Sequence, residues 1–425
     1  MKKLLVIGYH WPEPNTTAAG HRMLQLLHAF KERDFAITFA STAQRTPHSE
    51  DLAQGLGIVQ RAIVLNHPSF DEFICELAPD VVLFDRFITE EQFGWRVAQQ
   101  RPKALRILNT EDLHSLRKYR EHAHAKGLEA TERGWLGSDM AKREVASIYR
   151  CDLSLLVSTF EQELLERLWP GMANILYHLP FLLEALTDQT TGNWKKWETR
   201  QDVIFFGNGK HAPNLDAIKY LKNDIWPKLR KRLPAASLHI YGAYLPQHIL
   251  EMHQPATRFL VHGWAPDLAK VLGAARVHLA PLRFGAGIKG KLTEAMRCGT
   301  PSVTSNIGTE GMHGSLPWSG GVAQDTDGFV QKATELFENK ALWQRCQQGG
   351  LEILNALYNR SQLLPPFFDT LATMFDHLER HREQNVIGQL LQHHSLQSTK
   401  YLSKWIQEKG RRKASGSEMG QERSK

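Results

Sequence analysis

Two lysines and a glutamate follow a glycine-rich loop within residues 280–311, whose sequence is APLRFGAGIKGKLTEAMRCGTPSVTSNIGTEG. Glycine lets backbone amides come close to an anion, and a helix that opens near Ile288 turns the positive end of its dipole toward the same point. Glu294 lies about one turn after Lys291, so its carboxylate can accept hydrogen bonds there from a diol such as a ribose. The segment therefore predicts a nucleoside diphosphate site. Its residues are Gly285, Gly287, Lys289, Lys291 and Glu294. The alternative is a surface helix on which Lys291 and Glu294 form an exposed pair.

A second group of polar side chains follows an apolar run at residues 105–108. The sequence there, ILNTEDLHSLR, places Glu111, Asp112 and His114 at the expected carboxyl end of a strand. Ligands of parallel α/β sheets bind at that end. Because a histidine can orient a hydroxyl group and a carboxylate can accept its proton, these three are candidate catalytic residues. The alternative is an acidic helix cap followed by an ordinary helix histidine.

The segment FFGNGKHAPNL, which starts at Phe205, contains a partial dinucleotide fingerprint: Gly207, Gly209 and Ala212 match its spacing. A dinucleotide site also needs an acidic residue at the end of the next strand. The next predicted strand, within SLHIYGAY, ends at Gly242 without one. The sequence therefore argues against NAD, and no cofactor is predicted.

Short apolar runs that alternate with longer amphipathic segments must position these groups. Such alternation predicts parallel sheets wound with helices. One set of runs covers residues 4–7, 36–39, 62–65, 81–84, 105–108 and 153–157, and another covers 203–206, 238–241, 258–261, 277–280 and 302–304. We expect an α/β protein with two doubly wound, Rossmann-like domains at residues 1–180 and 201–382, joined by a linker at 181–200.

The chain ends in a helical segment with an apolar stripe at residues 383–408, which is predicted to dock on another surface. The members of the stripe are Val386, Leu390, Leu391, Leu396, Tyr401, Leu402 and Trp405. Contact of Tyr401 and Trp405 with lipid is the alternative. The polar, basic tail at residues 409–425 is predicted to be disordered, and its basic residues could instead contact lipid headgroups.

Length and composition limit the class of protein. A chain of 425 residues suits two domains, and no apolar run approaches the ~20 residues of a membrane-spanning helix. The 4 cysteines are scattered and the 20 histidines show no metal-ligand spacing. We therefore expect a soluble, cytoplasmic protein with reduced thiols and no metal. A net charge of +7, spread along the chain, favours anionic nucleotides or an acidic membrane surface over nucleic acid.

The run GAGIKGKLTEAMRCGTPSVTSNIGTEGM, residues 285–312, resembles the donor-site signature of the family 4 (group 1) glycosyltransferases, which have the GT-B fold. In that family a glutamate before an Ala-Met pair holds the ribose, and here this residue is Glu294. Many members carry a further glutamate eight residues upstream, where this chain has Ala286. The resemblance implies two Rossmann-like domains that face a cleft, with a C-terminal helix that crosses back to the first domain.

The resemblance also assigns roles to residues outside this run. It implies a donor-side loop at Gly207, Gly209, Lys210 and His211, and a nucleobase site at Gly263 and Trp264. A loop with Gly20 and Arg22 would contact the donor phosphates or the acceptor. In the same cleft, Glu111, Asp112 and His114 would meet the reacting sugar.

We therefore expect a retaining, metal-independent glycosyltransferase that moves a sugar from a nucleoside diphosphate donor to an acceptor hydroxyl. The resemblance implies assembly of cell-surface polysaccharide or lipopolysaccharide, with a saccharide or lipid-linked acceptor. The enzyme would then work at the inner face of the cytoplasmic membrane as a peripheral protein. Two alternatives remain open: a nucleotide-sugar epimerase of the same architecture and a non-catalytic nucleotide-sugar binding protein.

Overall fold

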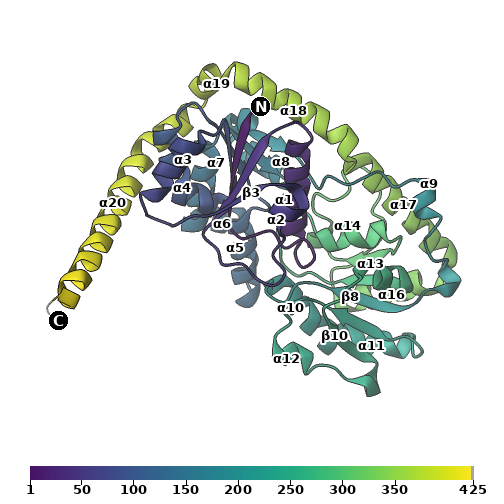
Figure 1. Ribbon diagram of the computed structural model, residues 1–425. Helices are drawn as coiled ribbons and strands as arrows, with labels where there is room; N and C mark the ends of the chain where they lie inside the picture. Colours follow the sequence, from purple (N-terminus) through teal and green to yellow (C-terminus); the bar gives the residue numbers. More distant parts are fainter. Residues whose placement is uncertain (423–425) are drawn as a thin grey trace.

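The protein contains two sheets, each covered by helices (Figure 1). The computed structural model describes the backbone of residues 1–422 and the side chains of residues 1–393 and 398–411. Every strand pairing within the two sheets is parallel. This arrangement confirms the predicted α/β class.

The first sheet has the strand order β3-β2-β1-β4-β5-β6-β7. Its strands are β1 Lys3–Gly8, β2 Ala36–Ser41, β3 Val59–Ala62, β4 Val81–Asp85, β5 Leu105–Asn109, β6 Leu153–Leu156 and β7 Leu176–His178. Its helices are α1 Ala18–Lys31, α2 Leu52–Leu56, α3 Ser69–Leu77, α4 Phe87–Gln100, α5 His114–Ala125, α6 Glu132–Gly137, α7 Asp139–Arg150 and α8 Thr159–Leu168. The strand order reverses between β1 and β4, so the carboxyl ends of these strands form the crevice in which such sheets bind ligands.

The second sheet has the order β10-β9-β8-β11-β12-β13. Its strands are β8 Gln201–Phe206, β9 Leu238–Tyr241, β10 Phe259–Gly263, β11 Ala275–Ala280, β12 Ser302–Thr304 and β13 Gly320–Val322. Its helices are α10 Ala212–Tyr220, α11 Trp226–Arg232, α12 Gln247–Leu250, α13 Leu268–Ala274, α14 Gly290–Arg297, α15 Asn306–Thr309, α16 Thr326–Glu338 and α17 Lys340–Leu357. The reversal here lies between β8 and β11. The loops after these two strands, residues 207–211 and 281–289, contain residues for which the sequence predicts donor binding.

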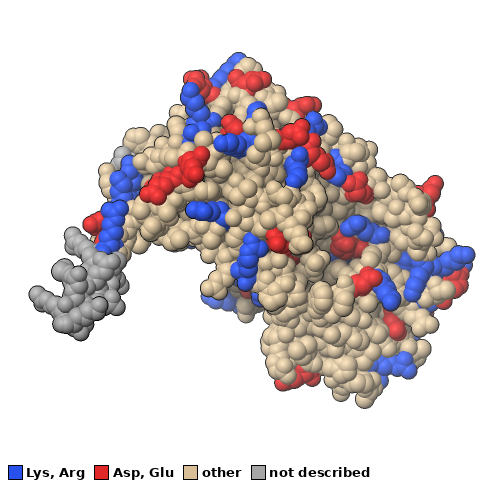
Figure 2. Space-filling model, viewed as in Figure 1, with Lys and Arg blue, Asp and Glu red and all other residues tan. Residues whose placement is uncertain are grey.

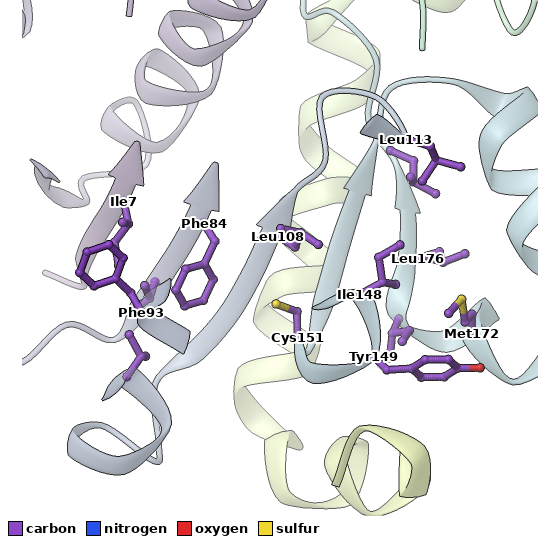
Figure 3. Packing of buried hydrophobic residues seen from close by; sticks show 14 of the residues in the cluster. Ile7, Phe84, Phe93, Leu108, Leu113, Ile148, Tyr149, Cys151, Met172 and Leu176 are labelled. Atoms are coloured by element: carbon purple, nitrogen blue, oxygen red, sulfur yellow. The ribbon is translucent and has the colours of Figure 1, made fainter. Parts of the chain in front are cut away.

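The apolar runs form the strands because both faces of each sheet are buried. In the first sheet, Leu5 and Ile7 of β1 belong to one core, while Leu4 and Val6 belong to the core on the other face. Figure 3 shows Ile7, Phe84 and Leu108 on adjacent strands of that first core, together with Phe93 of α4 and Ile148 of α7.

Three strands differ from the predicted pattern. Strand β3 covers Val59–Ala62 and not residues 62–65, because Val64 and Leu65 lie beyond the pairing with β2 and are exposed. Strands β7 and β13 were not predicted. Each has three residues, Leu176–His178 and Gly320–Val322, which is too short for a periodic pattern to show.

The chain crosses between the two sheets twice. The first crossing follows β7 and reaches β8 through residues 179–200, which include α9 Asp188–Thr191. The second follows α17 and leads into three further helices: α18 Arg360–Asp376, α19 Leu378–Gln384 and α20 Val386–Glu422. In Figure 1 these helices run from the second domain back over the first.

The boundary predicted for the second domain, residue 382, is therefore too late. Helix α18 already belongs to the first domain, because Phe367 and Leu371 are buried in the same core as Phe30 of α1. The rings of Phe30 and Phe367 meet edge to face, 6.0 Å apart. The sequence does not predict this helix because α18 contains two prolines, Pro365 and Pro366, which usually break helices.

The C-terminal segment at residues 383–408 crosses back to the first domain as predicted, where α20 packs on α4 and α7, but most of its apolar stripe stays exposed. Among the described side chains, Leu391 packs against the first core. Five others are exposed: Val386, Leu390, Tyr401, Leu402 and Trp405. The side chain of Leu396 lies outside the described residues. Polar contacts hold this end of the chain instead, since Arg382 of α19 binds the Asp152 carboxylate at 2.7 Å and the Ala104 carbonyl at 2.8 Å.

The tail predicted to be disordered continues α20 as helix from residue 409 to Glu422. Alanine, lysine, arginine and glutamate in this segment favour a helix. Residues 423–425 lie outside the described residues. Of the helices that the structure describes, none is long and apolar enough to cross a membrane.

Candidate active site at the domain interface

The predicted diphosphate loop lies directly against the first domain. Strand β11 ends at Ala280, and α14 begins at Gly290, two residues later than the sequence indicated. Gly287 has φ +64°, and a Cβ there would lie 2.8 Å from the Cβ of Asp112. Glycine is therefore required at this position for two reasons, the left-handed backbone and the contact with the other domain.

The N-termini of two helices from opposite domains meet beside this loop. A Cβ on Gly290, the first residue of α14, would lie 2.6 Å from the Cβ of Ala18, the first residue of α1. Thr17 caps α1 by accepting a hydrogen bond from the Gly20 amide at 2.9 Å. Both helix dipoles thus place their positive ends at the interface, which favours an anion there.

The two lysines of the motif add formal charge at this point. Lys289 is buried, and its ammonium donates to the Gly287 carbonyl. The ammonium of Lys291 donates to the Asn214 side chain and lies 4.4 Å from the centre of the Phe205 ring. Burial and the neighbouring charge of Lys289 lower the pKa of Lys291 to about 7. A bound diphosphate would relieve this repulsion.

Glu294 faces the first domain and does not pair with Lys291. Its carboxylate lies 4.0 Å from Nδ1 of His21 on α1 and 3.2 Å from the Arg297 guanidinium. The exposed Lys291–Glu294 pair that we considered as the alternative does not form. The carboxylate is partly exposed, so it can still accept hydrogen bonds from a ligand.

The candidate catalytic residues follow β5, as predicted, and an arginine holds two of them. Arg117 donates from Nε to the Asp112 carboxylate and from Nη2 to Nδ1 of His114, both at 2.6 Å. A guanidinium can only donate, so Nδ1 of His114 must be the acceptor and the neutral ring carries its proton on Nε2. Burial and the Arg117 charge lower the pKa of His114 to about 4.

Asp112 is a weak base in this arrangement. Burial by itself would raise its pKa, but the charge and hydrogen bond of Arg117 outweigh burial and lower the pKa. Glu111 differs, because burial and the nearby Asp85 carboxylate raise its pKa to about 7. Glu111 also has φ 65°, in the left-handed region that side chains rarely adopt. Such strain is common at functional sites.

Arg22 lies beneath the site and is not solvated. Its Nε donates to the Asn109 side chain at 3.2 Å, and its Nη1 donates to the Pro180 carbonyl at 2.6 Å. Gly20, two residues earlier on α1, packs tightly against the backbone of Glu13. Both residues therefore shape the interface from within, and the Arg22 side chain does not project freely into it.

The other donor-side loop follows β8. Gly207 packs against the Asn214 side chain and Gly209 against the backbone of Tyr244, while Lys210 is exposed over the Tyr244 ring. His211 is exposed at the interface, yet the protein atoms around it and the charge of Arg117 lower its pKa to about 3. The structure thus brings His211 of the second domain beside Arg117 of the first.

The predicted nucleobase site lies farther out on the same interface. Gly263 ends β10 with φ +76°. Trp264 is partly exposed, with its indole N–H 3.5 Å from the Asn15 carbonyl and its ring 5.7 Å from that of His48. Gly285 lies next to the Lys289 side chain, and its carbonyl accepts a hydrogen bond from Arg120 at 2.8 Å.

Sequence reasoning missed three charged residues at this interface. Arg117 and Arg120 lie on α5, and Arg120 forms an ion pair of 2.7 Å with Glu310 of the second domain. Glu161 of α8 accepts hydrogen bonds from the amides of Leu113 and Gly287. The spacing of His114, Arg117 and Arg120, three residues apart, indicates one polar helix face and could have identified the arginines. No local signal marks Glu161.

The described residues contain no group of three or more metal-binding side chains. Figure 2 shows a hollow in the surface where the two domains meet, with charged side chains around it. The site is therefore an interface between two domains. The second domain contributes Lys289, Lys291 and the N-terminus of α14, and the first contributes the N-terminus of α1 and the polar groups after β5.

Comparisons with known proteins agree with the fold of the two domains. Residues 200–339 match the family model described as glycosyl transferases group 1. No curated protein matches the chain in sequence.

Three solved structures illustrate the likeness in fold. Sucrose-phosphate synthase from Thermosynechococcus elongatus is 15% identical with a TM-score of 0.65, over 88% of this chain and 100% of that chain. HepE from Anabaena, in complex with UDP-glucose, is 13% identical with a TM-score of 0.63, over 88% of this chain and 100% of that chain. WaaG, a glycosyltransferase involved in lipopolysaccharide biosynthesis, is 11% identical with a TM-score of 0.59, over 86% and 98%. This likeness confirms the predicted GT-B architecture.

Proposed function

We propose that this glycosyltransferase moves a sugar from a nucleoside diphosphate to an acceptor hydroxyl. The premise is that the chain has the GT-B fold and matches the glycosyl transferases group 1 model at residues 200–339. One observation carries the proposal: α14 and α1 begin at the same point of the interface, where Lys289 and Lys291 add positive charge. A diphosphate is the anion that these groups suit.

The donor half of the proposal is supported by chemistry and by a structural neighbour. The solved structure of HepE has UDP-glucose bound. In this chain Glu294 would accept hydrogen bonds from the ribose diol, and Trp264 would cover the base. The sugar would then face His114 and Asp112, the second of which lies against the diphosphate loop at Gly287.

The transfer step breaks the bond between the anomeric carbon and the leaving phosphate oxygen, and forms a bond from that carbon to the acceptor oxygen. The acceptor proton passes to the leaving phosphate, because the lowered pKa of Asp112 makes it a poor base. Neutral His114 orients the acceptor hydroxyl. The lysines and helix amides stabilise the departing diphosphate without a metal ion, and the sugar retains its configuration.

We assign the reaction to the assembly of cell-surface polysaccharide or lipopolysaccharide, the process in which WaaG takes part. The acceptor is then a saccharide or a lipid-linked sugar, and the enzyme works at the inner face of the cytoplasmic membrane.

A thermal-shift screen of UDP-, GDP- and dTDP-sugars tests the donor. A true donor at 100 times its Kd stabilises the fold by about 2.7 kcal/mol. If none of these nucleotides raises Tm, the diphosphate site is refuted. Donor incubated without acceptor distinguishes an epimerase, which converts it, from a transferase. A binding protein would bind the donor and give no product with any acceptor.

A further inference from the structure

One cation at the crevice of the first sheet has no role in the reaction as described so far. Arg86 directly follows β4 and Tyr9 directly follows β1, the two strands between which the strand order reverses. The Arg86 guanidinium lies 5.2 Å from the centre of the Tyr9 ring. Ligands of doubly wound sheets bind at such a point. The two residues therefore lie where the first domain is expected to hold a ligand of its own.

Among the residues that the structure describes, the Arg86 guanidinium has neither an ion pair nor a hydrogen bond. Three other arginines of the interface, Arg22, Arg117 and Arg120, all donate hydrogen bonds to protein groups. Arg86 is partly buried, and a charge that is partly removed from water gains stability from a partner of opposite charge. An anionic ligand would supply that partner.

The backbone at Arg86 is strained. Its φ is 73° and its ψ is 156°, a combination found almost only for glycine. Two hydrogen bonds hold this conformation. The Arg86 amide donates to the Asn109 carbonyl at 2.8 Å, and the Arg86 carbonyl accepts from the Thr89 hydroxyl at 3.0 Å. Because an arginine in this conformation costs stability, the fold favours glycine here, and a role for the side chain explains the arginine.

The positive charge of Arg86 acts on the candidate catalytic residues. It contributes to the pKa values of Asp112 and His114, for which burial is the largest influence. The pKa of Lys291, by contrast, is lowered by burial and by the charge of Lys289. Arg86 therefore acts on the groups after β5 rather than on the lysines of the diphosphate site.

We infer that Arg86 binds an anionic group of the acceptor, a phosphate or a carboxylate near the hydroxyl that receives the sugar. The inference rests on the proposed function, because it names the class of acceptor for the same reaction. A guanidinium binds either group through two parallel hydrogen bonds. This contact positions the acceptor hydroxyl beside His114 and favours anionic acceptors over neutral sugars.

Binding of simple sugars to the full chain tests the inference. The protein is first saturated with whichever of UDP, GDP and dTDP stabilises it most, so that the diphosphate site is filled. Calorimetry then compares glucose 6-phosphate, glucuronate and glucose. At least one of the two anionic sugars should bind about tenfold or more tightly than glucose, because a charge-assisted contact is gained. The anionic sugar that binds identifies the group as phosphate or carboxylate.

Substitutions of Arg86 assign this preference to its side chain. Arg86→Gln should abolish the preference, and Arg86→Lys should keep part of it, because lysine retains the charge and loses the paired hydrogen bonds. Arg86→Gly should also abolish it, without a fall in Tm, because glycine adopts this backbone conformation without strain. The matched control is Arg33→Gln. Arg33 lies beyond the opposite end of α1, with its guanidinium 5.0 Å from the centre of the Phe368 ring, and its variant should bind as the wild type does.

Four outcomes overturn the inference. They are no binding of either anionic sugar, equally tight binding of glucose, an unchanged preference in Arg86→Gln, and a loss of nucleotide affinity in Arg86→Gln as large as the loss for the anionic sugar. The last outcome would assign Arg86 to the donor phosphates. Intact nucleotide binding without binding of an anionic sugar rejects the acceptor class alone. Failure of all three nucleotides to bind rejects the proposed reaction and the inference with it.

Discussion

The carboxylate of Glu161 in the first domain accepts a hydrogen bond of 2.7 Å from the backbone amide of Gly287 in the second. The same oxygen accepts from the Leu113 amide at 3.1 Å, and the other oxygen is buried without a hydrogen-bond partner among the described residues. One side chain thus joins the predicted diphosphate loop to the segment with the candidate catalytic residues. Burial, followed by the charge of Asp112, raises the pKa of Glu161 to about 8.

This raised pKa predicts a dependence of stability on pH. The ordinary value is 4.5, so between about pH 4.5 and 8 the unfolded chain loses this proton while the folded protein keeps it. The stabilisation is complete below pH 4.5 and is lost as pH rises toward 8. Glu161→Gln removes the titration, so the Tm of the variant minus that of the wild type should be larger at pH 8 than at pH 5, by about 2 °C or more.

Thermal unfolding at the two pH values measures this difference. Glu163→Gln, an exposed residue on the same helix, is the control and should show no change with pH. A constant difference for Glu161→Gln would mean that the carboxylate is already ionised in the folded protein.

The diphosphate site predicts a second dependence on pH. Lys289→Ala and Lys291→Ala should each weaken nucleoside diphosphate binding about tenfold or more, because a charge-assisted contact is lost. Lys291 has a pKa of about 7 and must be protonated to hold the anion. Affinity should therefore fall as pH rises above 7.

Lys291→Arg should remove that pH dependence, since arginine stays charged. Calorimetry with UDP at pH 6, 7 and 8 provides the measurement. Lys219→Ala, on the exposed surface of α10, is the control. Unchanged affinity in the two alanine variants and in their double variant would refute the site.

Glu294 is expected to contribute to binding of the ribose and not to binding of the diphosphate. Glu294→Ala should weaken UDP binding by several-fold, because the ribose diol loses an acceptor, and leave inorganic pyrophosphate binding unchanged. Competition between the two ligands measures this directly. A parallel loss of both affinities would assign Glu294 to the phosphates or to folding.

The residues after β5 should affect turnover more than donor binding. His114→Ala and Asp112→Asn should lower kcat by at least tenfold while nucleotide affinity changes little, because these groups face the sugar and the acceptor. Lys118→Ala, an exposed neighbour on α5, is the control. Full activity of both variants would mean that the two residues only cap a helix. A loss of nucleotide affinity equal to the loss of kcat would place them in the donor site.

Substitutions in α18 and in α20 are expected to differ in their effect on the free energy of unfolding. Phe367→Ala should lower the free energy of unfolding by about 3 to 5 kcal/mol, because it opens a cavity in the core of the first domain. Trp405→Ala should change it by about 0.5 kcal/mol or less, since the ring is exposed. Urea unfolding of both variants tests this, and a large effect of Trp405→Ala would show that the ring packs on the protein.

Local patterns in the sequence determined much of the architecture. Runs such as residues 81–84 are apolar without interruption because both faces of a parallel strand are buried, so neighbouring residues suffice to reveal them. The glycines and lysines of residues 285–291 are equally local, since a loop and a helix start bring them together within a few residues. The sequence therefore determined most strands of the two sheets and the loops at their switch points, and it predicts a diphosphate site in the second of these loops.

Tertiary structure alone decided which side chains meet across the interface and which surface is covered. Glu161 and Gly287 are 126 residues apart, and Arg120 and Glu310 are 190 apart. Such pairs depend on how two domains pack, which no local periodicity records. The apolar stripe of α20 shows the same limit. A helical pattern reveals that an apolar face exists, but its partner is set by the shape of distant surfaces. Here α20 packs on α4 and α7 and only Leu391 of the stripe packs against the core on that side, while Tyr401, Leu402 and Trp405 stay exposed.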